Sequence, residues 1–364
     1  MQDNMLKIKS SKNDYTVHFQ DSDELNFETE VFLLVDKNIE KLHKEKLKHY
    51  LELSRHVIYI DCTEDAKNIE NVIQYIYELT ESGINRQSSL VCIGGGIIQD
   101  ITCFISLILF RGISWTFIPT TLLAQADSCI GSKSSINTKL AKNLLGGFWS
   151  PETVIIDQVF LKTLNERDIR SGMAEIIKVH LIDGLESFEG LTITLNEFKY
   201  TNLDGIEKLI QDSLFIKKRY IEIDEFDQNE RLIFNYGHTF GHALEKSTFF
   251  QIPHGLAVNI GMHLANFYAL SLGFIDDAIY EKTKRIFISN YKNIDTHIDV
   301  DLFFQSIYKD KKNTNSEICL ILPINKLHKL DRFYFKKGED FKKLFLDFCK
   351  QYFDTNTYNI SYDA

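Results

Sequence analysis

Short runs of aliphatic and β-branched residues alternate with longer amphipathic segments in the first part of the chain, and this rhythm limits the folds that it can adopt. The runs VFLLVD (31–36), HVIYID (56–61) and SLVCIGGG (89–96) are each followed by a helical pattern, and WTFIP (115–119) and ETVIID (152–157) come later. Strands that alternate with helices build a parallel sheet covered on both faces. The sequence therefore predicts an N-terminal α/β domain with a parallel sheet.

The strand signal fades after about Leu164, and a helical pattern replaces it. From Asn165 to about Ser289, apolar residues recur at spacings of three and four, as in EIIKVHLIDGL and AVNIGMHLANFYALSL. One later run, SEICLILP (316–323), predicts a small hairpin or an edge strand. A chain of 364 residues exceeds the roughly 250–300 residues of a single core. We therefore expect two domains that share a cleft, an α/β domain at 1–164 and a mainly helical domain at 165–364.

The net charge of −10 argues against nucleic-acid or anionic-membrane partners, since both repel an acidic protein. Any anionic ligand must then be bound by locally gathered lysines and arginines. The six cysteines have no C-x-x-C spacing, which favours reduced core thiols over a disulfide framework or a zinc ribbon. The polar start and the lack of any apolar run near ~20 residues indicate a cytoplasmic protein.

Three glycines, Gly94 to Gly96, end a predicted strand and precede a predicted helix. Glycines at such a turn let backbone N–H groups approach a pyrophosphate, and the helix N-terminus favours negative charge. The spacing is not G-x-G-x-x-G, so a merely tight turn is the alternative. Asp36, at the end of the first strand, is placed either to bind a ribose hydroxyl or to cap a helix.

The segment between Pro119 and Pro151 is long and rich in Ser, Thr, Asn and Lys. Loops of this length inside a compact protein are usually functional. Its charged and amide side chains suit a phosphorylated, hydroxylated ligand, and a solvated loop with incidental lysines is the alternative. The side chains in question are Asp127, Lys133, Lys142 and Asn143.

Two histidines, each preceded by a glycine, occur in NYGHTFGHALE (235–245). Residues four apart share a helical face, so His238 and His242 project together. A mid-helix glycine costs roughly 1 kcal/mol relative to alanine. Gly237 and Gly241 therefore predict close approach of another backbone or of a ligand. We expect substitution of Gly241 to impair activity more than folding, because bulk there would crowd the cleft.

Further polar residues accompany the histidine pair. Arg231 and Asn235 are expected to extend the same helix backwards. A histidine pair is more often ordinary than metal-binding, but His254, in P-H-G, and Glu175, on an otherwise apolar helix, favour a catalytic zinc-type site. Lys178 lies one turn after Glu175 on the same face.

Together these stretches resemble the 3-dehydroquinate synthases and, more broadly, the sugar phosphate cyclases, over most of the chain. The most specific parts are GGG-x-x-x-D (94–100), F-R-G (110–112), P-T-T-L-L-A-Q-x-D-S (119–128), the G-H-T-F-G-H region (237–242) and H-G-x-A-V (254–258). The resemblance implies an NAD-binding Rossmann-like domain followed by a helical domain. It also implies a divalent metal, zinc or cobalt, and a homodimer.

The resemblance implies roles for individual residues. It makes Glu175, His238 and His254 the metal ligands and leaves His242 to contact substrate. Arg111 is similar to the family's phosphate-binding arginine, which reaches across a dimer interface. The remaining substrate contacts fall on Asp127, Lys133, Asn143, Lys178, Lys217, Arg231, Asn235 and one lysine of the Asp310-Lys311-Lys312 run. The NAD contacts fall on Asp36, Glu64, Lys67, Gly94, Gly95, Gly96, Asp100, Thr120, Thr121, Lys142, Phe160 and Thr163.

The sequence departs from the family pattern at several positions. The family's G-G-K-T-G-V-N is GSKSSIN here, which adds side chains at Ser132 and Ser135, and G-K-N is AKN, which adds one at Ala141. The glycine that usually precedes the Glu64-to-Lys67 spacing is also missing. H-G-E-A-V is HGLAV, so Leu256 replaces a carboxylate beside a zinc ligand, and such partners orient metal ligands. These changes bear on substrate identity more than on reaction type.

The implied activity is that of an NAD- and metal-dependent carbon–oxygen lyase of the shikimate pathway, which serves aromatic amino-acid biosynthesis. 3-Deoxy-D-arabino-heptulosonate 7-phosphate is oxidised at a secondary alcohol, loses phosphate by β-elimination, is reduced again and closes by an intramolecular aldol step to 3-dehydroquinate. Retention of Arg231 and Lys217, the expected carboxylate clamp, favours this substrate. The alternatives are a cyclase for sedoheptulose 7-phosphate or an amino analogue, an alcohol dehydrogenase related to glycerol dehydrogenase, and an inactive scaffold homologue.

Overall fold

The computed structural model describes residues 4–22, 27–292, 294, 297–309, 317–325, 329–353 and 358–359. The chain separates into two compact units. The first consists of Met1–Asn165 with Ile210–Arg231, and the second of Glu166–Leu209 with Leu232–Ala364.

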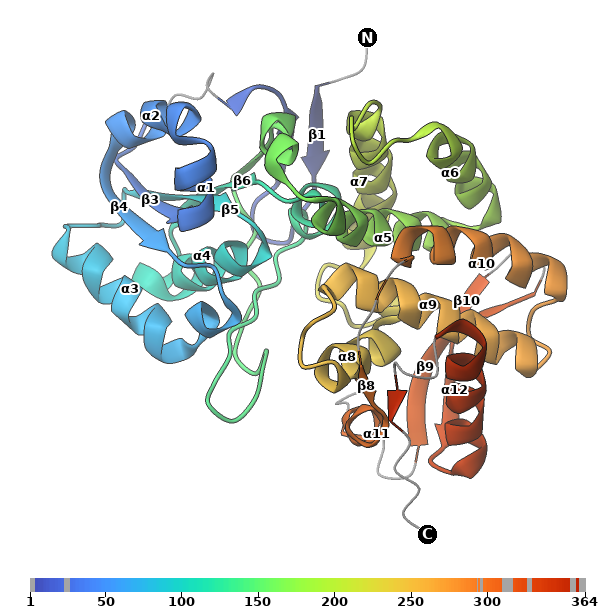
Figure 1. The fold of residues 1–364 in the computed structure, drawn as a ribbon. Helices are drawn as coiled ribbons and strands as arrows, with labels where there is room; N and C mark the ends of the chain where they lie inside the picture. The colour runs from blue at the N-terminus through green and yellow to red at the C-terminus, as the bar shows by residue number, and fades with distance from the viewer. Residues whose placement is uncertain are drawn as a thin grey trace. The chain divides into compact units, whose positions relative to one another are not determined.

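A seven-stranded sheet forms the centre of the first unit (Figure 1). Its strand order is β1-β2-β7-β6-β5-β3-β4, and every neighbouring pair is parallel except β1 with β2. The predicted parallel α/β sheet is thus confirmed, with an additional N-terminal hairpin at one edge. The strands are β1 (Met5–Ile8), β2 (Tyr15–Phe19), β3 (Val31–Asp36), β4 (Ser54–Ile60), β5 (Ser89–Gly94), β6 (Ser114–Pro119) and β7 (Thr153–Ile156).

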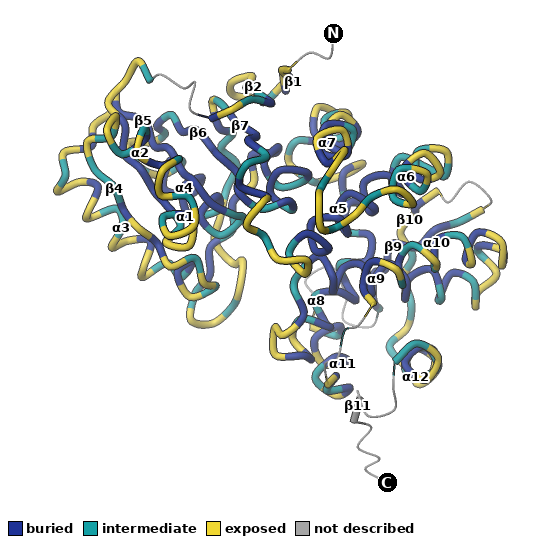
Figure 2. Tube along the Cα trace, turned by 45° about the horizontal axis from the view of Figure 1, so that its top comes forward, coloured by how far each residue is buried: buried dark blue, intermediate teal, exposed yellow. Residues whose placement is uncertain are grey.

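Helices cover both faces of this sheet (Figure 1). All of β5, and all of β3 except Asp36, is buried, as expected for strands of a parallel sheet that are covered on both sides. On one face Leu33 and Val35 of β3 share a core cluster with Leu47 and Tyr50, and Figure 2 shows the central strands β5, β6 and β7 as mostly buried. The helices are α1 (Lys37–Leu42), α2 (Lys44–Leu53), α3 (Ile69–Glu81) and α4 (Gly96–Ile108).

Residues 210–231, which the sequence analysis assigns to the helical domain, pack with the first unit instead. They include most of α7 (Ile206–Ile223) and the turn that follows it. Glu222 accepts a hydrogen bond from the backbone N of Lys9 at 2.9 Å, and Glu225 accepts one from Ser132 Oγ at 2.8 Å. These polar contacts join 210–231 to the N-terminal hairpin and to the loop after β6.

The second unit is mainly helical, as predicted. Two of its helices, α5 and α9, are buried along most of their length, and both have polar as well as apolar residues among the buried ones. The strand-like run near residue 317 forms an antiparallel hairpin of β9 (Glu317–Ile324) and β10 (Lys329–Lys336), and β8 (Ile298–Asp299) pairs in parallel with β11 (Tyr358–Asn359). The helices are α5 (Glu166–Asp183), α6 (Leu185–Glu197), α8 (His238–Ser247), α9 (His254–Ser271), α10 (Asp277–Tyr291), α11 (Val300–Tyr308) and α12 (Glu339–Tyr352).

The glycines of NYGHTFGHALE lie where α8 crosses α9. A Cβ on Gly241 would stand 3.0 Å from the Cα of Val258, and a Cβ on Gly261 would stand 2.1 Å from the carbonyl oxygen of Gly237. Of the two explanations that the sequence left open, close approach of a backbone is the one observed. The expected crowding of a cleft at Gly241 is therefore replaced by a packing requirement within the second unit.

Gly237 also ends the helix that the sequence predicted to continue back to Arg231. Gly237 is the N-cap of α8, and its φ of 76° is left-handed, a conformation that glycine adopts readily. The preceding residues, Glu230–Asn235, form a separate 3-10 helix. The prediction of one continuous helix through Arg231 and Asn235 is thus wrong.

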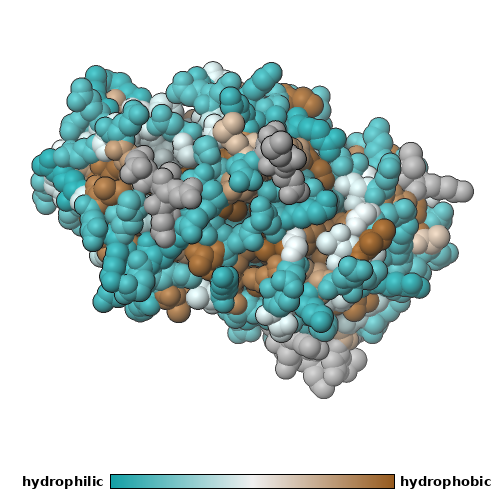
Figure 3. Space-filling model, turned by 90° about the horizontal axis from the view of Figure 1, so that it is seen from above, coloured by the Kyte–Doolittle hydropathy of each residue, from teal (hydrophilic) through white to brown (hydrophobic). Residues whose placement is uncertain are grey.

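The hydropathy of the surface and the state of the cysteines agree with the composition of the sequence. Figure 3 shows a face covered mostly by hydrophilic side chains, with hydrophobic ones in small groups. Among the described residues, no helix combines the length and the hydropathy that crossing a lipid bilayer requires. All six cysteines are free thiols, and five of them are buried, as the sequence predicted for core cysteines.

Candidate active site

Glu175, His238 and His254 form a group that could hold a metal ion. Each offers one ligand atom, and these atoms lie within 4.8 Å of one another. The three residues come from α5, α8 and α9, so the close crossing of α8 and α9 fixes the spacing of the two imidazoles. His254 Nε2 lies 3.8 Å from Glu175 Oε1, and the rings of His238 and His254 are 5.3 Å apart. Two imidazoles and one carboxylate are a donor set that suits zinc or cobalt with positions left for substrate.

The carboxylate of Glu175 lies in the interior of the second unit, where it is 1% exposed. The ammonium of Lys178, one turn later on α5, contacts it directly. A buried carboxylate needs cationic partners because desolvation disfavours an isolated charge. Glu175 therefore fits a site in which Lys178 and a metal ion share its negative charge.

His242 and Glu245 approach the same centre from α8. His242, Glu245 and His254 form a second group of potential ligand atoms within 4.8 Å of one another. Glu245 Oε2 lies 3.2 Å from His254 Nδ1, on the other side of the imidazole from the nitrogen that faces Glu175. The pKa of His254 is raised: burial disfavours the imidazolium, but the hydrogen bond and charge of Glu245 outweigh this.

Glu245 is the functional candidate that the sequence analysis did not identify. It closes the motif NYGHTFGHALE, and it follows His242 by three residues and His238 by seven, a spacing that places all three on one helical face. That spacing is the signal that could have found it. In the same region Leu256 is buried in α9, so the carboxylate beside His254 comes from α8 rather than from the H-G-x-A-V motif.

The glycine turn of the first unit lies at the carboxyl edge of the parallel sheet. The backbone N of Thr120, after β6, donates to the carbonyl oxygen of Gly94 at 2.9 Å. A Cβ on Gly95 would lie 3.1 Å from the methyl carbon of Thr121, whereas one on Gly96 would meet nothing within 4 Å. The N-terminus of α4 at Gly96 therefore opens beside this turn, at the edge where doubly wound sheets bind ligands.

Asp36 adopts the capping role that the sequence left as one of two alternatives. Its side chain accepts a hydrogen bond from the backbone N of Asn38 at 2.8 Å. Burial raises the pKa of Asp36, although that hydrogen bond acts in the opposite direction. A Cβ on Gly94 would come within 3.1 Å of Asp36 Cβ, so the carboxylate and the glycine turn are neighbours.

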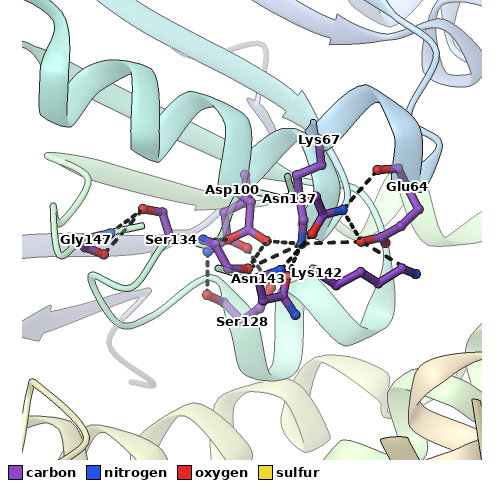
Figure 4. A network of polar contacts seen from close by, with 11 residues as sticks. Glu64, Lys67, Asp100, Ser128, Ser134, Asn137, Lys142, Asn143 and Gly147 are labelled. Atoms are coloured by element: carbon purple, nitrogen blue, oxygen red, sulfur yellow. Dashed lines mark hydrogen bonds and ion pairs between the residues drawn. The ribbon is translucent and has the colours of Figure 1, made fainter. Parts of the chain in front are cut away.

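Lys67 is the centre of a polar network that joins several predicted cofactor contacts (Figure 4). Its ammonium donates to Asp100 Oδ2 at 2.9 Å, to Asn143 Oδ1 at 3.0 Å and to Ser135 Oγ at 3.3 Å. Ser135 also donates to Asp100 from its backbone N and its hydroxyl, both at 2.9 Å. Ser135, which departs from the family pattern, is thus accommodated, and its hydrogen bonds to Asp100 link the loop to α4.

Glu64 and Lys142 complete this network. Glu64 Oε1 accepts from Asn137 Nδ2 at 2.8 Å and lies 3.9 Å from the ammonium of Lys142. The structure therefore brings Glu64, Lys67, Asp100 and Lys142 together, and it adds Asn143, which the sequence analysis assigns to the substrate.

Three predicted substrate-binding cations lie in the first unit and are held by acidic or carbonyl partners. Lys217 on α7 contacts Asp127 Oδ1 at 2.6 Å, and Asp127 lies in a π-helical turn, Ala124–Ser128. Arg231 donates to the backbone oxygen of Glu225 at 2.7 Å, and Lys133 donates to Asp227 at 2.8 Å.

The remaining predicted residues are dispersed. Thr163 Oγ1 lies 2.8 Å from His43 Nε2, and Phe160 is fully buried in the core cluster of the sheet. Arg111 has a left-handed backbone, with φ at 68°, in the short 3-10 helix Leu109–Arg111 that follows α4. Asn235 donates to the backbone oxygen of Leu232 in its own turn. Lys311 and Lys312, with Asp310, lie outside the described residues.

Known proteins share both halves of this architecture. The family model for the 3-dehydroquinate synthase N-terminal part matches residues 57–171, and the model for the C-terminal part matches residues 172–313. The 3-dehydroquinate synthase of Dictyoglomus thermophilum is 39% identical over 80% of this chain and 82% of its own length. The 3-dehydroquinate synthase of Helicobacter pylori (strain P12) is 37% identical over 89% of this chain and 93% of its own.

Solved structures with the same fold include two cyclases. One is a 2-deoxy-scyllo-inosose synthase complexed with carbaglucose-6-phosphate, NAD+ and Co2+, with a TM-score of 0.79, 21% identity and coverage of 95% of this chain and 99% of that one. The other is ValA, a 2-epi-5-epi-valiolone synthase from Streptomyces hygroscopicus subsp. jinggangensis with NAD+ and Zn2+ bound, with a TM-score of 0.79, 22% identity and coverage of 94% and 99%.

The parallel α/β unit, the helical unit and its Glu-His-His group define a protein with the fold of the sugar phosphate cyclases. Within that class the relatives found by sequence, at 39% and 37% identity, indicate the family more specifically than the structures at 21% and 22% identity do. The chain belongs to the 3-dehydroquinate synthase family.

Proposed function

We propose that this chain is an NAD- and divalent-metal-dependent lyase that converts 3-deoxy-D-arabino-heptulosonate 7-phosphate into 3-dehydroquinate and phosphate, a step of the shikimate pathway. The observation that carries the proposal is the group of Glu175, His238 and His254 in a chain of this family. An alcohol dehydrogenase of related fold would need the metal group as well, but the sequence relatives at 39% and 37% identity are named 3-dehydroquinate synthase.

The residues fit both cofactors. The buried carboxylate of Glu175 and the imidazoles of His238 and His254 would hold the metal, and the turn at Gly94–Gly96 with the N-terminus of α4 would accept the pyrophosphate of NAD. When bound, NAD supplies reversible hydride acceptance and the metal supplies polarisation of the substrate's oxygen atoms. The transient ketone makes the neighbouring C–H acidic, so phosphate can leave.

In this acidic protein, local cations must hold a substrate that carries both a carboxylate and a phosphate. We assign Lys217 and Arg231 to the substrate carboxylate, and Lys133 and Arg111 to the phosphate. Lys217 is oriented by Asp127 and Arg231 by the carbonyl of Glu225. A side chain that is already held needs less ordering when the ligand arrives.

His242 and Lys178 are the proton-handling groups of the proposal. His242 lies one turn from His238, with ring centroids 5.4 Å apart, and Lys178 touches Glu175. Both are therefore beside the proposed metal without belonging to its donor group of Glu175, His238 and His254. A histidine so placed can move a proton to or from the substrate near neutral pH.

The activity is tested with purified protein, NAD and zinc. Incubation with the heptulosonate phosphate should release phosphate without net accumulation of NADH, because the hydride is returned within each turnover. Sedoheptulose 7-phosphate and an amino analogue of the heptulosonate serve as rival substrates. Phosphate release from a rival alone would overturn the substrate, and steady NADH accumulation would instead indicate a dehydrogenase.

We further propose a cytoplasmic homodimer in which Arg111 serves the site of the second copy. Arg111→Ala and His238→Ala should each be inactive alone. Mixed dimers formed by unfolding and refolding the two variants together should regain activity, because one of their two sites then has neither defect. If mixing restores nothing although mixed dimers form, Arg111 acts within its own chain.

A further inference from the structure

Glu245 is a carboxylate beside the proposed metal group, and the proposed function gives it no role. It lies on α8, and its Oε2 is 3.2 Å from Nδ1 of His254. Its side chain is 16% exposed, whereas that of His254 is 37% exposed. We propose that Glu245 is a positioning residue that fixes the orientation and tautomer of His254 for metal binding. The inference rests on the metal group of the proposed function.

The hydrogen bond selects one tautomer of His254. An ionised carboxylate can only accept, so Nδ1 of His254 must carry the proton that it donates to Glu245. The remaining nitrogen, Nε2, then has the lone pair. Nε2 is also the atom that lies 3.8 Å from Glu175 Oε1, on the side of the proposed metal. Glu245 therefore directs the coordinating nitrogen toward the donor group.

His238 shows the same arrangement with a different acceptor. Its Nδ1 lies 3.2 Å from the backbone oxygen of Tyr236, which again assigns the proton to Nδ1 and the lone pair to Nε2. Metal-binding histidines commonly donate their second N–H to a carbonyl or a carboxylate. Each imidazole of the group is thus oriented by a hydrogen bond at Nδ1, His238 by the main chain and His254 by Glu245.

His254 needs such a partner because of its place in the fold. It is the first residue of α9, directly after the N-cap Pro253, so no earlier helical turn packs against its side chain. Fixing a partly exposed imidazole in one rotamer costs conformational entropy when the metal binds. The contact with Glu245 meets part of that cost before binding.

The test compares the metal affinity of the wild type with that of two Glu245 variants. Glu245→Ala removes the acceptor and should weaken zinc or cobalt binding by roughly 10- to 100-fold, measured by competition with a chromophoric chelator. Glu245→Gln keeps an acceptor oxygen and should retain most of the affinity. Lys246→Ala, at the exposed neighbouring position of α8, is the matched control and should bind metal as the wild type does.

The cobalt-loaded proteins separate positioning from ligation. When saturated with cobalt, Glu245→Ala should keep the visible absorption bands of the wild type, because the donor atoms are unchanged. Affinity in Glu245→Gln as low as in Glu245→Ala, or altered bands in both, would show that Glu245 is itself a ligand and would overturn the inference. Wild-type affinity in Glu245→Ala would overturn it as well.

Two further measurements keep the result interpretable. Thermal unfolding of each metal-free variant shows whether α8 is intact, and Glu245→Met, which has similar length but no acceptor oxygen, replaces Glu245→Ala if that variant does not fold. A wild-type protein that binds no metal would overturn the metal group itself and, with it, the role of Glu245. Failure of the inference alone therefore differs from failure of the proposed function.

Discussion

His238 and His242 lie one turn apart on α8, but only His238 shares a donor group with Glu175. We expect His238→Ala to lose most of its metal. His242→Ala should keep metal in a one-to-one ratio and should turn over roughly 10²-fold more slowly, as expected for loss of a proton-transferring group. Metal content and phosphate release, measured on the same preparations, check both statements. Loss of metal from His242→Ala would favour the second group, His242, Glu245 and His254.

The sequence could predict which residues form the candidate metal group better than it could predict which residues orient them by hydrogen bonds. Glu175, His238 and His254 were identifiable by residue type and by resemblance, and the structure brings them together. Glu245 shares the helical face of the two histidines, but its contact with His254 could not be predicted, because that contact depends on the path of the loop between α8 and α9. In that loop Phe249 and Phe250 both have positive φ, at 51° and 60°. Phenylalanine rarely adopts this conformation, so no local pattern predicts the turn.

At the scale of the elements, the close crossing of α8 and α9 depends on Gly237, Gly241 and Gly261. Substitution of Gly241 tests this directly. Gly241→Ala would place its Cβ 3.0 Å from the Cα and N of Val258. Backbone atoms cannot rotate away, so α8 and α9 must separate. We expect a loss of about 1–3 kcal/mol in the free energy of unfolding, measured by urea denaturation.

Gly190 of α6 is the matched control for this substitution. A Cβ there would meet no atom within 4 Å. Gly190→Ala should therefore raise the free energy of unfolding by about 0.5–1 kcal/mol through the better helix propensity of alanine. Equal effects of the two substitutions, in either direction, would contradict the packing role of Gly241.

The element pattern of the sequence predicts secondary structure more reliably than it predicts which elements pack together. The alternation of strands and helices gave the parallel sheet, since each buried strand is a continuous apolar run. The helical periodicity of 206–223 predicts α7 but carries no information about which unit covers its faces. In the fold, Glu222 and Glu225 contact residues that are far away in the sequence, and long-range partners of this kind leave no local signal.

At the scale of the whole molecule, the second unit contains a buried histidine that should make its stability depend on pH. His263 of α9 contacts the hydroxyls of Tyr291 at 2.7 Å and Tyr280 at 3.0 Å, and Tyr280 contacts Tyr352. Burial lowers the pKa of His263 to about 3, and Lys284 acts in the same direction. The folded protein therefore keeps this imidazole neutral.

The sign of the effect follows from linkage. Well above the unfolded pKa of about 6.5 the imidazole is neutral in both states, and its contribution to stability is fully present. As the pH falls from about 6.5 to about 3, the unfolded chain binds a proton that the folded chain does not, so stability falls by about 1.4 kcal/mol per pH unit. His263→Gln removes this group. The free energy of unfolding should then decline less steeply with acid than in the wild type, and equal slopes between pH 6 and 4.5 would contradict the prediction.

The chain leaves the first unit at residue 165 and returns to it for 210–231 before leaving again. During synthesis, the first unit is therefore incomplete until residue 231 has emerged from the ribosome, although its sheet is finished long before. Until then Ser132 lacks the carboxylate of Glu225, and Asp127 lacks the ammonium of Lys217. For the same reason, a fragment that ends at residue 165 does not contain the complete first unit. Chimeras that exchange the NAD-binding half between relatives need to carry 210–231 with it.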